Sequence, residues 1–273
     1  MAGNYSALFS GNFSKPFDSP VVLFTYSPSR SQTVAEQLLE GYQGYLQTDG
    51  YTAYAHVCGK HGLTHLGCFA HVRRKFDEAL KAQGKKAARV NPKLKPESIA
   101  AQALTIIQQL YRIEADINAL PPEQKRMTRQ EQAVPILNQL RGWLDQALTQ
   151  VPPLSLTGKA LAYLHKQWPT LTVYCEDGRL EIDNNSVERA IRPFVIGRKA
   201  WLFSDTVHGA KASANLYSLI ETARLNGQEP YAYLCRVFEA LPKAQTLADI
   251  EQLLPWQVHQ NSVNANRTSK QAA

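Results

Sequence analysis

The chain has 273 residues, 44% of them hydrophobic, which is enough to build one large domain or two ordinary ones around a sizeable core. A net charge of +7 favours an anionic partner, while the lack of a long apolar run and of a basic and apolar leader argues against a membrane-spanning or secreted protein. The four cysteines form no CxxC pair, which argues against a disulfide framework and favours reduced thiols in the cytoplasm.

The first part of the chain is predicted to alternate strands and helices. Residues 1–20 are polar without clear periodicity, and we expect them to be poorly ordered. Runs of β-branched and aromatic residues, and apolar residues at helical spacing, then predict a strand, a helix and two strands. These elements are, in chain order, Val21–Tyr26, Ser29–Tyr42, Tyr45–Thr48 and Leu63–Phe69.

A basic helix is predicted next, over residues 70–82. Residues 71–95 hold nine Lys or Arg against two acids, so this stretch carries the whole net charge of +7. A concentrated basic segment is the electrostatic footprint of a polyanion partner. The alternative is a solvated basic helix and linker, and we interpret Lys85, Lys86 and residues 91–96 as a flexible connection.

Residues 96–168 change character and are predicted to be helical. Apolar side chains recur there at steps of three and four residues, as on an amphipathic helix, at Ile106, Leu110, Ile113, Ile117 and Leu120. Two proline pairs punctuate the region, and they separate this helix from further helix at Glu123–Gln150 and from a last one at Ser155–Trp168.

The segment Asp177–Pro193, DGRLEIDNNSVERAIRP, gathers acids, arginines and amides around a predicted helix start. Asp183 is the predicted N-cap. Asn184, Glu188 and Arg192 are spaced to share one helical face. A carboxylate among amides and guanidinium groups suits a site where metal ions and phosphates meet. The alternative is a surface helix with solvated ion pairs.

The rest of the chain is predicted to hold a short strand and three helices. The strand is expected at Ala200–Ser204, and the helices begin near Ala210, Pro230 and Thr246. The polar tail of residues 257–273 is expected to be disordered.

Two acids are the first candidates for chemistry. Asp49 ends a predicted strand, and functional side chains collect at the carboxyl ends of strands in open α/β sheets. Glu188 lies on a helix that can pack against that sheet. Two such carboxylates can hold Mg²⁺, and two ions about 3.5–4 Å apart would activate the attacking oxygen and stabilise the leaving oxygen of a phosphodiester.

Five sequence blocks make this interpretation specific. They are QGYLQTDGYTAY around Asp49, GCFAHVRRKF, DGRLEIDNNSVERAIRP, GRKAWLFS and SLIETARLNGQEPYAYL. Over residues 21–256 the chain closely resembles transposases of the insertion sequence 66 (IS 66) family. The resemblance implies a DDE recombinase with an α/β, ribonuclease-H-like catalytic core. Such enzymes cleave and join DNA with Mg²⁺ or Mn²⁺, and two ions are expected in an intact site.

The resemblance also implies roles for residues of this chain. Asp49 is the second catalytic acid and metal ligand, and Glu188 is the third, with Glu181 as the alternative for the third. Active-site neighbours are expected at Cys68, His71 and Asn184. For the C-x-x-H pair the alternative is a buried cysteine and a hydrogen-bonded histidine, because a zinc site would need two further ligands.

Basic residues near these acids are the expected DNA contacts. Arginine grips phosphate oxygens bidentately, and lysine adds positive charge. The expected contacts are Arg73, Arg74, Lys75, Arg192 and Lys199. Pairing with the neighbouring acids is the alternative.

The family pattern divides the chain into six segments. They are a poorly ordered remnant at 1–20, the first part of the catalytic core at 21–95, a helical insertion at 96–168, the remaining core at 169–226, a C-terminal helical region at 227–256 and a disordered tail at 257–273.

One part of the family pattern is missing. It requires a first acid on a first strand, and residues 1–20 offer only Asp18, in a hairpin-turn position. We therefore interpret the chain as an N-terminally truncated transposase that is inactive alone, with the edge of Val21–Tyr26 exposed. The competing hypothesis is a non-catalytic DNA-binding module that inhibits transposition.

The expected partners follow from the resemblance. They are DNA, as transposon ends and target, and another transposase chain in an oligomer. We expect the protein to be associated with the bacterial nucleoid in the cytoplasm and not with a membrane.

Overall fold

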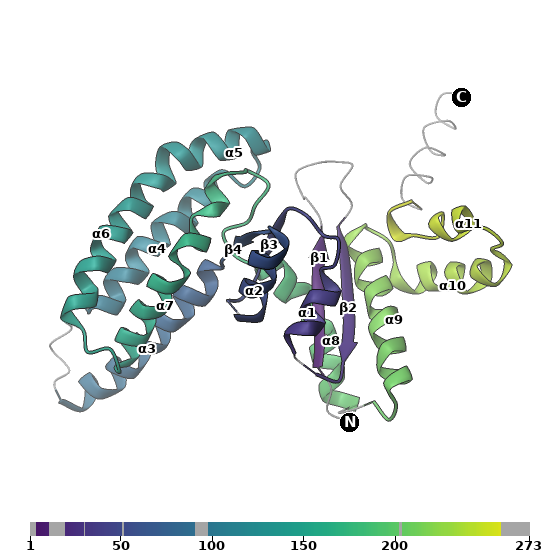
Figure 1. Ribbon diagram of the computed structural model, residues 1–273, viewed down its shortest axis with the longest axis horizontal. Coiled ribbons are helices and arrows are strands. Elements are labelled where there is room, and N and C mark those ends of the chain that lie inside the picture. The colour runs from purple at the N-terminus through teal and green to yellow at the C-terminus, as the bar shows by residue number, and fades with distance from the viewer. Residues whose placement is uncertain are drawn as a thin grey trace. The chain divides into compact units, whose positions relative to one another are not determined.

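The computed structural model describes residues 4–10, 20–29, 31–50, 52–90, 98–201 and 204–257, with backbone alone at 4–10, 52, 84–90 and 198–201. The chain forms two compact units, Met1–Arg30 with Ser186–Ala273, and Ser31–Asn185. We call the first the hairpin unit and the second the helical unit (Figure 1). The described residues are mostly helical and contain two small sheets.

The helical unit opens with short elements around a parallel strand pair. Tyr45, Leu46 and Gln47 of β3 pair with Thr64, His65 and Leu66 of β4. The elements are α1 (Gln32–Leu38), β3 (Tyr45–Gln47), α2 (Thr52–His61) and β4 (Thr64–Leu66). Because the two strands are parallel, their carboxyl ends lie at the same edge.

Four long helices follow and run side by side (Figure 1). They are α3 (Phe69–Val90), α4 (Ile99–Asp116), α6 (Val134–Gln150) and α7 (Leu156–Leu171). Between α4 and α6 lie α5 (Pro122–Thr128) and a π-helical turn, η1 (Arg129–Ala133), and a 3-10 turn, η2 (Val173–Cys175), follows α7. The serine hydroxyls of Ser98 and Ser155 accept N–H groups of the first turns of α4 and α7 and fix where these helices begin.

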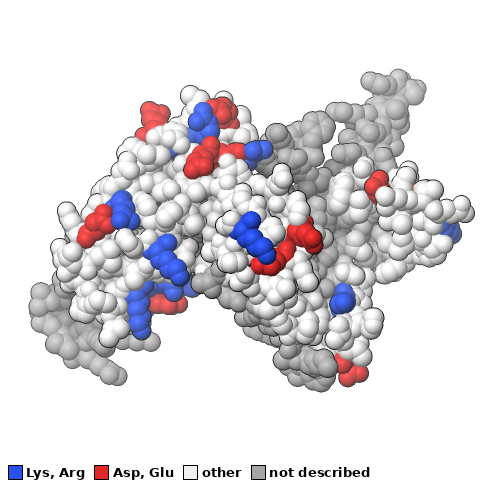
Figure 2. Space-filling model, in the orientation of Figure 1, with Lys and Arg blue, Asp and Glu red and all other residues white. Residues whose placement is uncertain are grey.

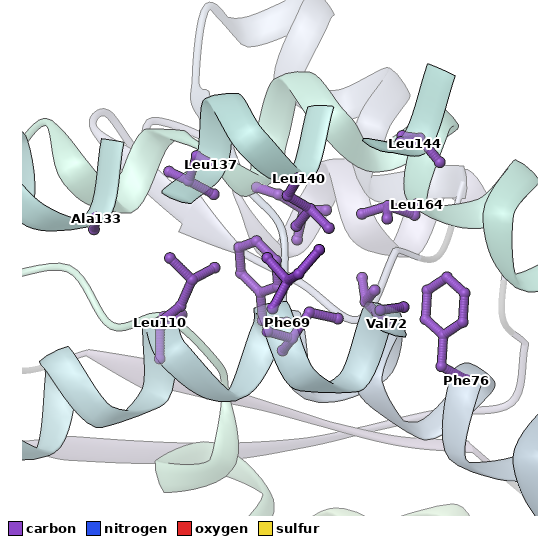
Figure 3. Close-up of a cluster of buried hydrophobic side chains, with 14 of the residues drawn as sticks. Phe69, Val72, Phe76, Leu110, Ala133, Leu137, Leu140, Leu144 and Leu164 are labelled. Carbon is purple, nitrogen blue, oxygen red and sulfur yellow. The ribbon is translucent and has the colours of Figure 1, made fainter. Parts of the chain in front are cut away.

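The apolar faces of these helices meet in one core (Figure 3). Leu110, Leu140 and Leu164 come from three different helices and are fully buried. Each such side chain contributes about 1.5–3 kcal/mol by leaving water. Phe69 and Phe76 of α3 close the core from the fourth helix.

The hairpin unit is built on two antiparallel strands, β1 (Asn4–Ser10) and β2 (Val21–Ser27). Against them pack α8 (Asn185–Trp201) and α9 (Val207–Leu225). Phe24 of β2 stacks on Phe194 of α8 with ring centroids 5.1 Å apart, and Tyr217 of α9 meets Phe194 edge-on at 4.8 Å. Among the side chains that the structure describes, this buried cluster is smaller than the core of the helical unit.

Two hydroxyls of α9 cover the outer edge of β2. Thr222 Oγ1 accepts the N–H of Val22 at 3.0 Å and donates to its carbonyl at 3.1 Å. Ser218 Oγ accepts the N–H of Phe24 at 2.8 Å. The expected exposed edge at Val21–Tyr26 is therefore wrong, because β1 pairs with one side of β2 and α9 satisfies the other.

The chain closes with α10 (Pro230–Ala240), η3 (Leu241–Lys243) and α11 (Leu247–Glu251). Thr246 and Asp249 form a capping box at the start of α11, as the position of Thr246 predicts. The hydroxyl of Tyr233 donates to the carbonyl of Leu253 at 2.9 Å and ties α10 to the segment after α11.

Three sequence expectations need correction. Residues 4–10, expected to be poorly ordered, form β1, because pairing with β2 supplies the hydrogen bonds that a polar sequence cannot reveal. The strand at Ala200–Ser204 is wrong for Ala200 and Trp201, which continue α8 as its face packs on the hairpin. Lys85 and Lys86 belong to α3 rather than to a flexible connection. Residues 91–97 and 258–273, and Asp18, lie outside the described residues.

Candidate functional site

Asp49 lies in the turn at the carboxyl end of β3. Its side chain is exposed, and its backbone carbonyl accepts the hydroxyl of Tyr163 on α7 at 3.1 Å. Gly50 follows with φ +86°, and a Cβ there would lie 2.8 Å from the Tyr163 hydroxyl oxygen. Both features favour glycine at this point, and the hydrogen bond from α7 holds the Asp49 backbone.

The turn after β4 brings Cys68 and Asn184 together. The buried Cys68 thiol donates to Asn184 Oδ1 at 2.9 Å, and the Asn184 N–H donates back to the sulfur at 3.4 Å. Burial raises the pKa of the Cys68 thiol, so it remains a protonated donor. His71 lies in the first turn of α3, three residues further on. Asn184 precedes α8, and its side-chain amide is bonded to Cys68. The predicted helical face therefore contains Glu188 and Arg192 but not Asn184.

Two tyrosines place two cations of α3 beside these turns. Lys75 Nζ lies 4.6 Å from the centroid of the Tyr163 ring, and the Arg73 guanidinium carbon lies 5.8 Å from that of Tyr111. Each ring faces a cation while its hydroxyl binds an acidic residue: Tyr163 bonds to the carbonyl of Asp49, and Tyr111 to the carboxylate of Asp183. The exposed Arg74 lies between the two cations in sequence.

Burial and neighbouring groups keep both phenols protonated. The pKa of Tyr163 is raised to about 12. Burial is the largest cause, followed by electrostatic repulsion from Cys68 and Asp49. Burial, and after it the Asp183 charge, holds the pKa of Tyr111 well above its ordinary value. Both hydroxyls are therefore donors at neutral pH.

Several other cations of the helical unit form ion pairs. Figure 2 shows Lys and Arg side chains interspersed with acidic ones on this face of the unit. Lys81 of α3 binds Asp77 at 2.6 Å, and Arg141 of α6 binds Asp145 at 2.9 Å. Arg141 also lies over a ring, 5.7 Å from the centroid of Trp168, so Lys75 and Arg73 are distinguished by rings whose hydroxyls bond to Asp49 and Asp183.

Glu188 lies in the first turn of α8, in the hairpin unit. Ala190 and Phe194 form the buried face of that helix against the hairpin. Glu188 is two residues from Ala190, and Arg192 is two residues from both. A step of two residues is about 200° around the axis, so Glu188 and Arg192 lie away from the buried face of α8. Lys199 also belongs to α8, where only the backbone is described.

A segment of residues 173–185, which we call the strap, leads from α7 into α8. It contains both Glu181 and Asp183. Glu181 is exposed, and its carbonyl accepts Gln47 Nε2 at 2.8 Å. Asp183 is buried, and its carboxylate accepts the N–H of Asn185, the first residue of α8, at 3.0 Å. The predicted N-cap is wrong by one position: Asn184 directly precedes α8, and Asp183 accepts the first helical N–H from one residue earlier.

Three side chains that organise this region could not be identified from the sequence. Tyr111 and Tyr163 occupy ordinary positions in amphipathic helices, and only their contacts distinguish them. Arg129 is fully buried and binds Glu114 through two hydrogen bonds, of 2.9 and 2.6 Å. A buried arginine stands out only when its burial is known.

The described residues do not by themselves assemble a metal centre. Among them there is no group of three or more His, Cys, Asp or Glu side chains placed to hold an ion. Asp49 and Glu188 are oxygen donors of the kind that Mg²⁺ and Mn²⁺ prefer. No reaction step through a metal is therefore assigned to this chain. None of the described helices has the length and apolar character that a membrane span needs.

Comparison with known families gives two adjoining matches. Residues 6–212 match the family described as "Transposase IS66 family", and residues 218–256 match the "IS66 C-terminal element". Together they extend over both units of the chain.

Curated relatives come from Sinorhizobium fredii (strain NBRC 101917 / NGR234). The uncharacterized proteins y4jD, y4hP and y4qI are 33%, 31% and 30% identical to this chain. Each alignment covers 87% of this chain but only 45%, 44% and 43% of the respective relative, so the chain spans less than half of their length. No solved structure matches the chain.

Proposed function

Since the chain belongs to the IS66 transposase family, we propose that it acts in DNA transposition and meets DNA at the carboxyl ends of β3 and β4. One observation carries the location: Tyr163 joins Lys75, through its ring, to the backbone of Asp49, through its hydroxyl. A cation for phosphate is thereby held beside an acid suited to a metal ion.

In this proposal the residues take different roles. Asp49 and Glu188 are the two catalytic acids that the chain contributes, within a ribonuclease-H-like core, to a site for Mg²⁺ or Mn²⁺. Lys75 and Arg73 bind DNA phosphates near Asp49, and the aromatic rings limit the freedom of their side chains. Arg74, Arg192 and Lys199 add further phosphate contacts.

A salt titration of DNA affinity tests the location. Each phosphate contact contributes about 0.9 to the slope of log affinity against log salt on duplex DNA. We expect Lys75→Gln to lower the magnitude of the slope by about that amount. Lys81→Gln is the matched control, because Lys81 is an exposed lysine of the same helix already paired with Asp77. An unchanged slope in Lys75→Gln would contradict the proposed location.

A cleavage assay separates the enzyme from a non-catalytic DNA-binding module. The chain is incubated with DNA and Mn²⁺, alongside Asp49→Asn and Glu188→Gln. Cleavage or strand transfer that both substitutions abolish supports a catalytic role for these acids. An inactive catalytic fragment and a non-catalytic module both bind DNA without cleavage, and Mn²⁺ binding then separates them: both substitutions weaken it in the catalytic fragment, and neither has an effect in the module.

A further inference from the structure

The strap is clamped to the helical unit at its start. The guanidinium of Arg129, in the π-helical turn η1, donates to the carbonyls of Tyr174 at 2.9 Å and Asp177 at 3.0 Å. The adjacent Gln130 donates to the carbonyl of Cys175 at 2.8 Å. On a regular helix, neighbouring side chains diverge by about 100°. Arg129 and Gln130 are neighbours that both bind the strap, and they lie in the wider π-helical turn η1.

The strap is held again at its far end. The N–H of Phe69 donates to the carbonyl of Ile182 at 3.1 Å, and Cys68 and Asn184 bond to each other. The hydroxyl of Tyr111, from the middle of α4, reaches Asp183 Oδ2 at 2.8 Å. Asn185 adds two donors to the same carboxylate, its backbone N–H at 3.0 Å and its side-chain amide at 2.6 Å.

We propose that Tyr111 is a positioning residue that, through Asp183, fixes the first residue of α8 and so the turn that carries Glu188. The inference rests on the proposed role of Glu188. Asp183 is buried, and its donors are the phenol and the start of α8. Without the phenol, the hydrogen bonds that the described residues donate to this carboxylate all come from Asn185, in the turn that it holds.

This assignment gives the helical insertion a specific task. Tyr111 and Arg129 both belong to residues 96–168, and both end on the strap. The insertion therefore supports the start of α8 through the hydrogen bonds of Tyr111 and Arg129, and its own helices are held by a large apolar core.

Amide hydrogen exchange of the chain with Tyr111→Phe tests the proposal. The substitution removes one hydrogen bond to a charged group, which corresponds to roughly tenfold or more in a local opening equilibrium. We expect exchange in the peptide 183–188 to accelerate by about tenfold while peptides of α6 keep their protection. Tyr233→Phe is the matched control, because it also removes one tyrosine hydroxyl bonded to one acceptor, in α10.

Two further measurements keep the outcome clear. Asp183→Asn retains the size of the side chain and removes its charge, and faster exchange in the same peptide is expected if Tyr111→Phe does not fold. Unchanged exchange in peptide 183–188, or equal acceleration throughout the chain, overturns the positioning role. The metal-binding and cleavage assays with Glu188→Gln test the proposed role of Glu188 separately, since hydrogen exchange in Tyr111→Phe is measured without DNA or metal.

Discussion

The helical unit and the hairpin unit differ in the described buried apolar side chains that support their candidate acids. Asp49 belongs to a unit that has one extended apolar core from four helices and a buried ion pair between Arg129 and Glu114. Glu188 lies on a helix whose described buried contacts with its hairpin are centred on Phe24 and Phe194. The comparison teaches that the two acids should differ in their sensitivity to single substitutions.

The largest expected effect is in the hairpin unit. Phe194→Ala removes a ring that stacks on Phe24 and is almost fully buried, and we expect it to destabilise the chain by about 3–5 kcal/mol. The matched control is Phe238→Ala in α10, where the ring is 57% exposed and the expected change is within about 0.5 kcal/mol. Urea unfolding measures both, and equal losses would show that the small cluster is not the weak point.

A buried charge gives an effect of similar size in the helical unit, where the substitution removes an ion pair rather than apolar packing. Glu114→Ala leaves the Arg129 guanidinium, 2% exposed, without its carboxylate, and we expect a loss of about 3–5 kcal/mol. Glu123→Ala breaks the exposed pair with Arg126 and should cost about 0–1 kcal/mol. If thermal unfolding gave the two variants the same stability, Arg129 would not be the clamp that its contacts indicate.

Close backbone packing under the strap gives a moderate effect. A Cβ on Gly178 would overlap the carbonyl of Pro122, so we expect Gly178→Ala to cost about 1–3 kcal/mol. Gly142 lies within α6 with open space around it, and Gly142→Ala should instead stabilise the chain by about 0.5–1 kcal/mol. The opposite signs can be measured by chemical unfolding, and destabilisation in both would contradict this account.

The smallest expected effect depends on pH. Hydrogen bonds from the Arg179 side chain hold the pKa of Asp177 below its ordinary value of about 3.9. The charged carboxylate therefore stabilises the fold above about pH 4, and this contribution disappears as pH falls through the lowered pKa. Asp177→Asn should lower Tm slightly at pH 6, and the difference should shrink at pH 3.

The size of this effect is limited by solvent. Arg179 is half exposed, so the contribution should not exceed about 1 kcal/mol. The exposed Asp205→Asn controls for the change of charge. A difference in Tm that grows as the pH falls would reverse the sign and contradict the assignment.

Much of the helical unit could be predicted from sequence because its signals are local. The apolar spacing of Ile106, Leu110 and Ile113 places α4, and all three are buried in the core. The proline pairs and the hydroxyl of Ser155 separate the later helices. The second helix, Thr52–His61, carries no strong periodic signal and was not predicted.

The candidate site was predictable only as a set of residue types. Asp49 at a strand end and Glu188 at a helix start follow from local patterns and from the family blocks. Tyr111, Tyr163 and Arg129 could not be found this way, because their partners lie from 15 to 114 residues away in sequence. No local pattern specifies a contact at such a separation.

The sequence by itself determined the family, the order of most elements and the helix starts that depend on neighbouring side chains, such as Thr246. Tertiary structure decided what depends on distant partners. It made residues 4–10 a strand, extended α8 through Trp201, covered the edge of β2 with Ser218 and Thr222, and buried Asp183 beneath Tyr111. The physical reason is that hydrogen bonds and burial across the chain outweigh local preferences of a few tenths of a kcal/mol per residue, roughly the scale of helix and strand propensities.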